Sequence, residues 1–176
     1  MPLSEVFLAL APAIIAIGVL KYRSDYRRFG RTTVLGVTLL LAAWFIPHLV
    51  LGYSMPMFPP PKVPRQWVGY GLMSVGAALA IVPLHRFSSK MVVGIDTKRL
   101  ITSDIYRFSR NPQYTGYALF PIGYAMVGNT LLAYVGVVLF LVLMHLTVLV
   151  EEEHLERQFG DEYRHYKERT PRYFIF

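Results

Sequence analysis

The chain contains no cysteine among its 176 residues. It can therefore form no disulfide, no thiolate nucleophile and no cysteine-ligated zinc site. Charged residues are also scarce, at 16% of the sequence, whereas soluble globular domains average about 25%. Acidic residues are the rarer kind, with 11 Asp and Glu against 18 Lys and Arg, while hydrophobic residues reach 54%. This composition indicates a membrane protein rather than a soluble domain.

The hydrophobic residues gather in blocks that are close in length to a membrane span. A helix needs about 20 apolar residues to cross about 30 Å of hydrocarbon. Five blocks approach this length, at about 3–20, 32–53, 67–84, 116–128 and 131–150. Because only Asn129 and Thr130 separate the last two blocks, we expect a tight helical hairpin there. The sequence thus predicts an all-α, polytopic membrane protein with about five transmembrane helices, in a single domain over 1–176.

The two parts of this domain differ in character. Residues 1–84 hold the three N-terminal transmembrane helices. Residues 85–176 hold a long cytoplasmic loop, the hairpin and a C-terminal helix, and we expect this part to be catalytic and to form a cytoplasmic cofactor-binding cap. The apolar block after Thr130 continues without a helix breaker as far as Gly160, so one long helix should leave the membrane. Asp161 then begins a short helix that ends at Pro171.

The basic residues predict the orientation. All Lys and Arg except Lys62 and Arg65 lie between the first and second blocks, between the third and fourth blocks, or after the fifth. By the positive-inside rule these three segments are cytoplasmic, so the N-terminus is outside and the C-terminus is cytoplasmic. The positive charge is therefore explained by anionic lipid headgroups of the bilayer, and we expect no nucleic-acid partner.

Several ionisable residues of the fifth block and its extension are candidates for chemistry. Glu151 and His154 lie on one helix face, and a carboxylate there could hold a cationic ligand; the alternative is that Glu151–Glu153 only mark where the helix leaves the bilayer. His145 lies at membrane depth, so we expect it to face the protein interior; the alternative is a neutral histidine bonded to a neighbouring helix. No set of three metal ligands occurs at familiar spacings, so no metal site is expected.

The loop and the last helices contain an ordered series of motifs. Leu-Ile-Thr-Ser-Asp-Ile-Tyr at 100–106 precedes Arg-Asn-Pro-Gln-Tyr-Thr-Gly at 110–116. Glu151-Glu152, Leu155, Phe159-Gly160, Tyr163 and Pro171-Arg172 follow the hairpin. This order resembles the isoprenylcysteine carboxyl methyltransferases and the related phospholipid methyltransferases. Their pattern has Leu-Val-Thr-x-Gly-x-Tyr, then Arg-His-Pro-x-Tyr-x-Gly, Glu-Glu-x-x-Leu, Phe-Gly-x-x-Tyr and Pro-Arg.

The resemblance implies an integral membrane enzyme that transfers a methyl group from S-adenosylmethionine to a lipophilic or amphiphilic acceptor at the cytoplasmic interface. The acceptor could be a prenylcysteine-like carboxylate, a phospholipid amine or a small thiol. By position, the residues implied to contact the cofactor are Lys98, Arg99, Leu100, Ile101, Tyr106, Asn111, Pro112, Gln113, Tyr114 and Glu151. Proton transfer from an amine acceptor could be assisted by His145, Glu152 or His154. The alternatives are a membrane reductase of the sterol reductase type that uses NADPH, and a non-catalytic lipid-binding membrane protein.

The chain departs from the family pattern at three places. Asn111 stands where the family usually has a histidine, so this position cannot titrate. Asp104-Ile105 replaces a glycine-containing pair, which should alter the turn before Tyr106. Thr147 stands where the prenylcysteine enzymes have an arginine that serves the substrate. The cofactor half of the pattern is thus kept better than the substrate half.

Overall fold

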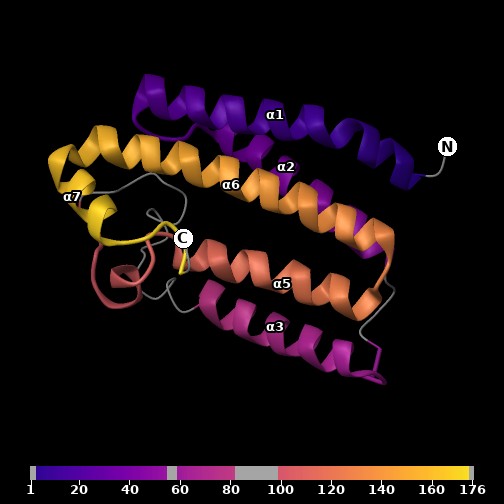
Figure 1. The fold of residues 1–176 in the computed structure, drawn as a ribbon. Helices are drawn as coiled ribbons and strands as arrows, with labels where there is room; N and C mark the ends of the chain where they lie inside the picture. Colours follow the sequence, from indigo (N-terminus) through magenta and orange to yellow (C-terminus); the bar gives the residue numbers. More distant parts are fainter. Residues whose placement is uncertain (1–2, 55–58, 82–98, 175–176) are drawn as a thin grey trace.

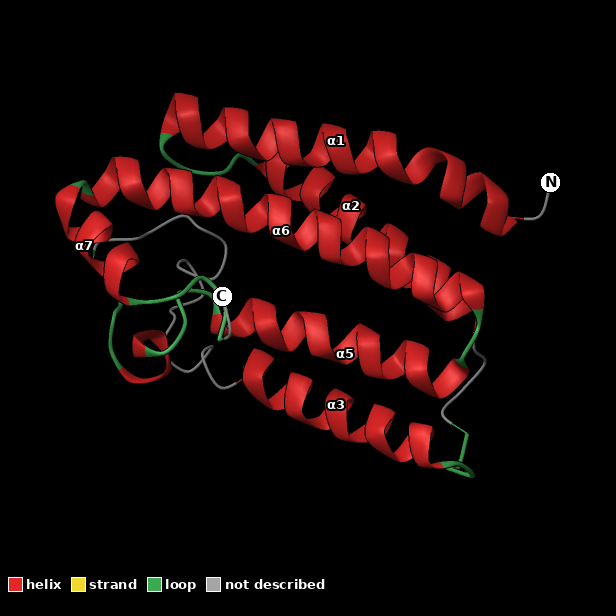
Figure 2. Cartoon of the chain, in the orientation of Figure 1, coloured by secondary structure: helices red, strands yellow, loops and turns green. Residues whose placement is uncertain are grey.

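The fold was analysed in a computed structural model, which describes residues 3–54, 59–81 and 99–174. Within these ranges every regular element is helical and none is a strand (Figure 2). The elements are α1 (Leu3–Phe29), α2 (Val34–Ser54), α3 (Pro64–Ile81), the 3₁₀ helix η2 (Asp104–Arg107), α5 (Pro112–Gly128), α6 (Leu131–Phe159) and α7 (Asp161–Arg169). The predicted all-α fold is confirmed.

The long helices form a bundle around α6. Helices α1 and α2 pack against each other and against α6, while α5 packs against the other side of α6 (Figure 1). Helix α3 lies outermost and packs chiefly against α5. Helix α7 turns back from the end of α6 and, with the C-terminal residues, faces the loop that precedes α5. The two motifs identified in the sequence, before α5 and after α6, are therefore brought to the same end of the bundle.

The predicted hairpin of α5 and α6 is confirmed. Helix α5 ends at Asn129, which adopts a left-handed conformation with φ 53°. Thr130 then caps α6, because its side-chain oxygen accepts a hydrogen bond of 3.1 Å from the backbone N–H of Ala133. These two residues are enough to reverse the chain, because Asn129 has the left-handed conformation that ends α5 and Thr130 has the extended conformation that begins α6.

The lengths of the helices partly differ from the apolar blocks. Helix α1 extends beyond the first block to Phe29, and α5 begins at Pro112, ahead of the fourth block. Helix α6 runs on to Phe159 as predicted, and Gly160 follows it with φ 54°. Among the described helices, α6 alone combines the length and hydropathy needed to cross a membrane, while α2 contains a shorter apolar stretch, Val34–Leu49. One span is thus supported, and the other four remain a prediction.

The basic segments gather at one end of the bundle. The turn between α1 and α2, the 3₁₀ helix η2 and α7 all lie there, while the N-terminus and the turn between α5 and α6 lie at the opposite end (Figure 1). This arrangement is compatible with one cytoplasmic end, as the charge distribution predicts.

A buried aspartate fixes the turn between α1 and α2. The side chain of Asp25 is 1% exposed and forms an ion pair with Lys21. It also accepts hydrogen bonds from the backbone N–H and the hydroxyl of Thr33, at 3.1 and 2.5 Å. Since a buried carboxylate is stable only when it is paired and hydrogen-bonded, these contacts hold the end of α1 in one orientation.

Helices α3 and α5 approach closely at two pairs of glycines. A Cβ atom added to Gly69 would lie 2.7 Å from the carbonyl oxygen of Gly123, and one added to Gly116 would lie 2.5 Å from that of Gly76. Real Cβ atoms do not come so near to backbone oxygens, so each pair requires glycine. Small residues that permit such close packing are typical of helix interfaces in membranes.

We predict that Gly69→Ala lowers the thermal unfolding midpoint of the detergent-purified protein, because the added methyl group forces α3 away from α5. Overpacking of this kind costs about 1–3 kcal/mol. The matched control is Gly71→Ala on the same helix, where nothing lies within 4 Å of an added Cβ. Equal midpoints for the two variants would contradict the close approach.

Candidate functional site

A cavity of about 770 Å³ opens between the helices. This volume is in the range of cavities that hold small molecules or cofactors. Five helices and η2 contribute to its wall. Polar side chains include Tyr22, Tyr106, Asn111, Gln113, Tyr114 and Glu151, and apolar ones include Leu40, Leu41, Trp44, Ala80, Phe120 and Phe140. The cavity can therefore accept a ligand with one polar and one apolar part.

Glu151 is held at the cavity wall by two tyrosine hydroxyls. Its Oε1 accepts a hydrogen bond of 2.6 Å from Tyr114 on α5 and one of 3.1 Å from Tyr22 on α1. The hydroxyl of Tyr22 also lies 3.1 Å from that of Tyr26. All three tyrosines are buried. The carboxylate of Glu151 is thus oriented by neutral donors, so its negative charge remains available to a cationic ligand.

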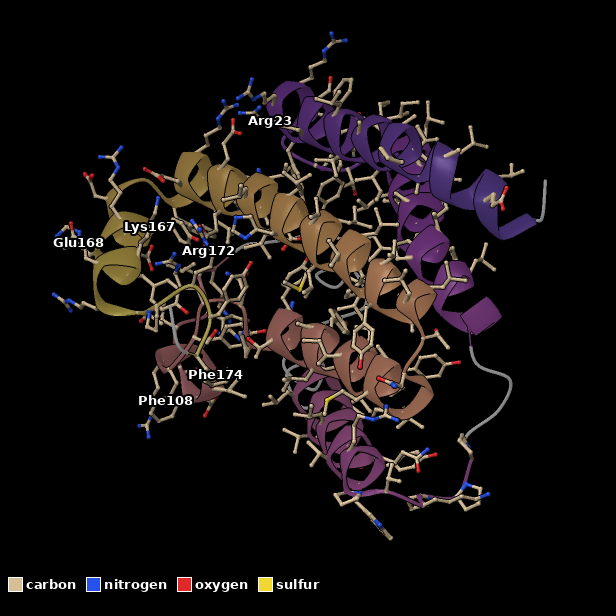
Figure 3. The ribbon with its side chains drawn as sticks, turned by 45° about the vertical axis from the view of Figure 1, so that its right-hand side comes forward. Arg23, Phe108, Lys167, Glu168, Arg172 and Phe174 are labelled. Atoms are coloured by element: carbon tan, nitrogen blue, oxygen red, sulfur yellow. The ribbon has the colours of Figure 1, made fainter. Side chains whose placement is uncertain are left out.

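Surface ion pairs hold α1 beside α6 near these tyrosines. Arg23 and Arg27 of α1 both contact the carboxylate of Glu153, each at 2.7 Å. Figure 3 shows Arg23 at the outer surface of the bundle. Exposed pairs of this kind contribute little to stability individually. They nevertheless require the same alignment of α1 along α6 as the hydrogen bond between Tyr22 and Glu151 does.

Next to Glu151 an aromatic wall lines the cavity, composed of Trp44, Tyr114, Tyr117 and Phe140. The ring of Trp44 on α2 lies 5.6 Å from that of Tyr117 and 5.1 Å from that of Phe140, both in edge-to-face geometry. It also lies 6.2 Å from the ring of Tyr114. These separations are those that favourable aromatic pairs adopt. The wall therefore joins α2, α5 and α6 into one surface of the cavity.

Glu152, the next residue along α6, has entirely different surroundings. Its Oε1 accepts hydrogen bonds from Arg110 and from the amide of Asn111, at 3.1 and 3.2 Å. Its Oε2 accepts two from the guanidinium of Arg172, at 3.1 and 2.8 Å. We call Glu152, Arg110, Asn111 and Arg172 the Glu152 cluster. Both carboxylate oxygens are engaged, and the residue is only 4% exposed. Glu152 therefore links the motif before α5 to the C-terminal segment and does not face the cavity.

The C-terminal segment is fastened to the same cluster through its backbone. The guanidinium of Arg110 donates to the carbonyl oxygens of Lys167 and Thr170, both at 2.8 Å. The backbone N–H of Arg110 donates to the carbonyl of Pro171 at 2.9 Å. In Figure 3, Glu168 points away from α7 while Arg172 lies on its inner side. Hydrogen bonding to Glu152 raises the pKa of the Arg172 guanidinium, so Arg172 stays protonated.

The turn before Tyr106 keeps a glycine-like conformation without glycine. Asp104 has φ 55°, in the left-handed region that few residues other than glycine, asparagine and aspartate visit. The hydroxyl of Tyr106 then donates to Gln113 at 2.6 Å, and Tyr166 of α7 donates to the carbonyl of Tyr106 at 2.6 Å. Burial raises the pKa of Tyr106, so its hydroxyl remains a donor. The backbone of Asp104 thus adopts a conformation that glycine also favours, and the expectation that Asp104-Ile105 alters the turn stays a prediction.

The predicted site residues fall into two groups. Those that line the cavity are Tyr106, Asn111, Gln113, Tyr114, Glu151 and His154. Arg99, Leu100, Ile101, Pro112 and Glu152 do not line it. Pro112 acts through the backbone, as the first residue of α5. Lys98 lies outside the described residues.

His145 is placed differently from the prediction. Its side chain is exposed, and its Nδ1 lies 3.0 Å from the hydroxyl of Tyr173. It does not line the cavity. The expectation that His145 faces the protein interior is wrong, because the rotation of α6 that buries Met144 and Thr147 turns His145 outward.

His154 is buried beside the cavity. Its ring stacks on that of Tyr26, with centroids 4.1 Å apart. It is 9% exposed, and its Nε2 has no hydrogen-bond partner among the described residues. This placement does not test the predicted role of His154 in proton transfer, which stays a prediction.

The cavity also contains residues that sequence reasoning missed. Tyr22 and Tyr26 follow the first predicted span, in a segment expected to be a basic cytoplasmic loop, and Trp44 lies in the second predicted span. Their contacts with Glu151 and Tyr114 join residues that are far apart in the chain, so no motif spacing reveals them. The only local signal is that Tyr22 and Tyr26 lie four residues apart, on one face of a helix.

Comparison with known proteins identifies a family. The family model described as phospholipid methyltransferase matches residues 64–162, which is more than half of the chain. The matched region contains α3, the Arg-Asn-Pro-Gln-Tyr turn, the hairpin and the Glu-Glu pair. No curated protein and no solved structure matches the chain. The match favours the methyltransferase interpretation over the reductase alternative.

We predict that Glu152→Gln destabilises the protein, because it leaves the buried guanidinium of Arg110 and the part-exposed one of Arg172 without a counter-charge. Breaking a buried ion pair from one side costs about 3–5 kcal/mol, and a substitution that retains one hydrogen-bond acceptor should cost somewhat less. Thermal unfolding in detergent measures the change. The control is Glu156→Gln, an exposed position on the same helix, where the midpoint should hardly move. A Glu152→Gln variant as stable as this control would contradict the role of the cluster.

A second prediction concerns the turn at Asp104. Asp104→Gly should be tolerated, whereas Asp104→Val should lower stability by about 1–2 kcal/mol, because a branched side chain is strained at positive φ. The neighbouring Ser103 is also exposed but extended, with φ −90°, so Ser103→Val serves as the control. Chemical unfolding curves distinguish the variants. If Asp104→Val and Ser103→Val unfold alike, the left-handed turn is not present in solution.

Proposed function

The chain belongs to the phospholipid methyltransferase family, and from this premise we propose that it transfers a methyl group from S-adenosylmethionine to an amphiphilic acceptor at the cytoplasmic face of a membrane. The observation that carries the proposal is the position of Glu151. Its carboxylate lies on the wall of a cavity whose remaining surface is largely aromatic and aliphatic. A cationic cofactor and a lipophilic acceptor can therefore meet in one space.

The donor set of the cavity fits this cofactor. S-adenosylmethionine carries an ammonium and a sulfonium group, and its sulfonium supplies the methyl group. Glu151 offers a carboxylate whose orientation is set by Tyr114 and Tyr22. Asn111 and Gln113 add amide groups at the same cavity, suited to the polar atoms of a nucleoside. We assign Glu151 to the cofactor ammonium and these amides to the remainder of the cofactor.

Methyl transfer requires little from the protein beyond alignment. A lone pair of the acceptor forms a bond to the methyl carbon while the carbon–sulfur bond breaks, and S-adenosylhomocysteine leaves as a neutral thioether. Reacting atoms held about 3–3.5 Å apart in line gain most of the available acceleration from positioning. A protonated amine acceptor must first lose a proton, for which we propose His154, a buried histidine that lines the cavity. The packing of α1, α2, α5 and α6 around the cavity supplies the rigid frame.

The acceptor side of the cavity favours an amine over a carboxylate. Thr147 stands where the prenylcysteine enzymes have an arginine, and its hydroxyl donates to the carbonyl of Leu143 at 2.9 Å. Among the described residues that line the cavity, Arg110 is the only Lys or Arg, and it is paired with Glu152. Among the described lining residues, an anionic acceptor therefore finds no unpaired lysine or arginine, whereas an amine or ammonium head meets aromatic faces and a carboxylate.

We predict that S-adenosylhomocysteine, which keeps the cofactor ammonium, binds the detergent-purified wild type saturably in isothermal titration calorimetry. Glu151→Gln should weaken binding about 10- to 100-fold, because a hydrogen bond to a charged group is worth about 1.5–3 kcal/mol. Tyr114→Phe removes one donor that orients the carboxylate and should weaken binding less. Glu156→Gln, which lies on the exposed face of α6, should bind as the wild type does.

Two results would contradict the proposal. One is the absence of S-adenosylhomocysteine binding to folded wild-type protein. The other is equal affinity of the Glu151→Gln and Glu156→Gln variants, which would place the cofactor elsewhere. A parallel titration with NADPH tests the reductase alternative, for which saturable NADPH binding would be required.

A further inference from the structure

We propose that Trp44 is a specificity-determining residue that binds the head of an ammonium-bearing amphiphile against the aromatic wall, and that α2 thereby supplies the acceptor half of the site. This inference rests on the proposed function and adds to it the residue and the helix that select the acceptor. Helix α2 lies outside the segment matched by the family, residues 64–162. Selection of the acceptor is thus assigned to a helix outside the matched segment.

The position of Trp44 joins the two parts of the cavity. On one side its ring contacts Tyr114, which donates directly to Glu151. On the other side it contacts Phe140, within the apolar lining. Only the side chain of Tyr114 thus separates Trp44 from the carboxylate of Glu151. A ligand on the aromatic wall therefore lies close to the negative charge of Glu151. Trp44 is the only tryptophan among the residues that line the cavity, and tryptophan presents the most attractive face for a cation.

The charges around the cavity select the sign of the head group. Glu151 is the only carboxylate among the described residues that line it, and neutral hydroxyls hold it, whereas the guanidinium of Arg110 is already engaged by Glu152 and by two backbone carbonyls. The imidazole of His48 lies beside the backbone carbonyl of Trp44, with Nδ1 2.7 Å from that oxygen. The groups left to meet a ligand are therefore the aromatic faces and the carboxylate of Glu151, both of which attract a cation. A protonated amine, which can lose a proton and then accept the methyl group, matches the wall better than a phosphate or carboxylate would.

The apolar lining provides a path for the acyl chains. Leu41 on α2 and Phe120 on α5 both line the cavity, yet they are 53% and 38% exposed. They therefore lie at its rim, between the interior and the outer surface of the bundle. An amphiphile can place its head on Trp44 while its chains pass Leu41 and Phe120 into the surrounding lipid, so the head group rather than the chain is recognised.

The test compares two short-chain phospholipids that differ only in the ammonium. Dioctanoyl phosphatidylethanolamine and dioctanoyl phosphatidylethanol share their acyl chains and phosphate, and binding of each to the full-length protein in dodecyl maltoside is measured by calorimetry. Wild type should prefer the ethanolamine lipid about five- to tenfold, and Trp44→Leu should lose this preference, as expected for a cation–π contact. Trp44→Phe should retain part of it. Phe45→Leu is the matched control, because Phe45 is 65% exposed on the same helix and does not line the cavity.

Binding of S-adenosylhomocysteine to each variant separates a loss of fold from a loss of selectivity. Unchanged cofactor affinity with lost head-group preference in Trp44→Leu supports the inference. Equal preference in Trp44→Leu and Phe45→Leu, or no preference in the wild type, overturns it even if the cofactor binds. Failure of cofactor binding alone instead contradicts the proposed function.

A second measurement does not depend on the Leu variant folding. The chain has two tryptophans, so Trp67→Phe leaves Trp44 as the sole indole reporter. Saturating ethanolamine lipid should shift or quench its fluorescence, and the ethanol lipid at equal concentration should have a smaller effect. Identical responses to both lipids would overturn the inference.

Discussion

The site depends on one buried carboxylate, that of Glu152, and on the three side chains that satisfy it. Arg110 and Asn111 reach it from the turn before α5, and Arg172 reaches it from the C-terminal segment. A buried charge is tolerated only with such complete pairing. This pairing positions the start of α5, helix α7 and the backbone at Pro171. The wall of the cavity that α5 contributes therefore depends on it.

Two adjacent carboxylates on α6 have separate tasks. Consecutive helical residues point about 100° apart, so Glu152 faces the C-terminal segment while Glu151 faces the cavity. Glu152 is paired with guanidinium groups, whereas Glu151 accepts hydrogen bonds from the hydroxyls of Tyr114 and Tyr22. The same helix thereby provides a neutralised carboxylate for structure and one available to a cationic ligand. Asn111, which stands where the resemblance places a histidine, contacts both sides, because its amide donates to Glu152 and its side chain also lines the cavity.

Local features of the fold could be predicted, and features that depend on packing could not. The hairpin at Asn129 and the helix end at Gly160 follow from short-range signals, the two-residue gap and the absence of a breaker. The outward position of His145 depends on the rotation of α6 within the bundle, which apolar content on all faces of the helix does not reveal. Tyr22 and Trp44 reach the site from more than 60 residues away in the chain, so only tertiary packing discloses them.

The proposed site has a cofactor half, built from the family motifs on α5 and α6 together with Tyr22 of α1, and an acceptor half to which α2 contributes. The most direct measurement is a crystal structure grown in a lipid phase with S-adenosylhomocysteine bound. It should show the amino group of the ligand within hydrogen-bond distance of the Glu151 carboxylate, with Glu152 still bound to Arg110 and Arg172. A ligand located outside the cavity, or one whose amino group contacts Glu152 in place of Arg172, would contradict the central claim.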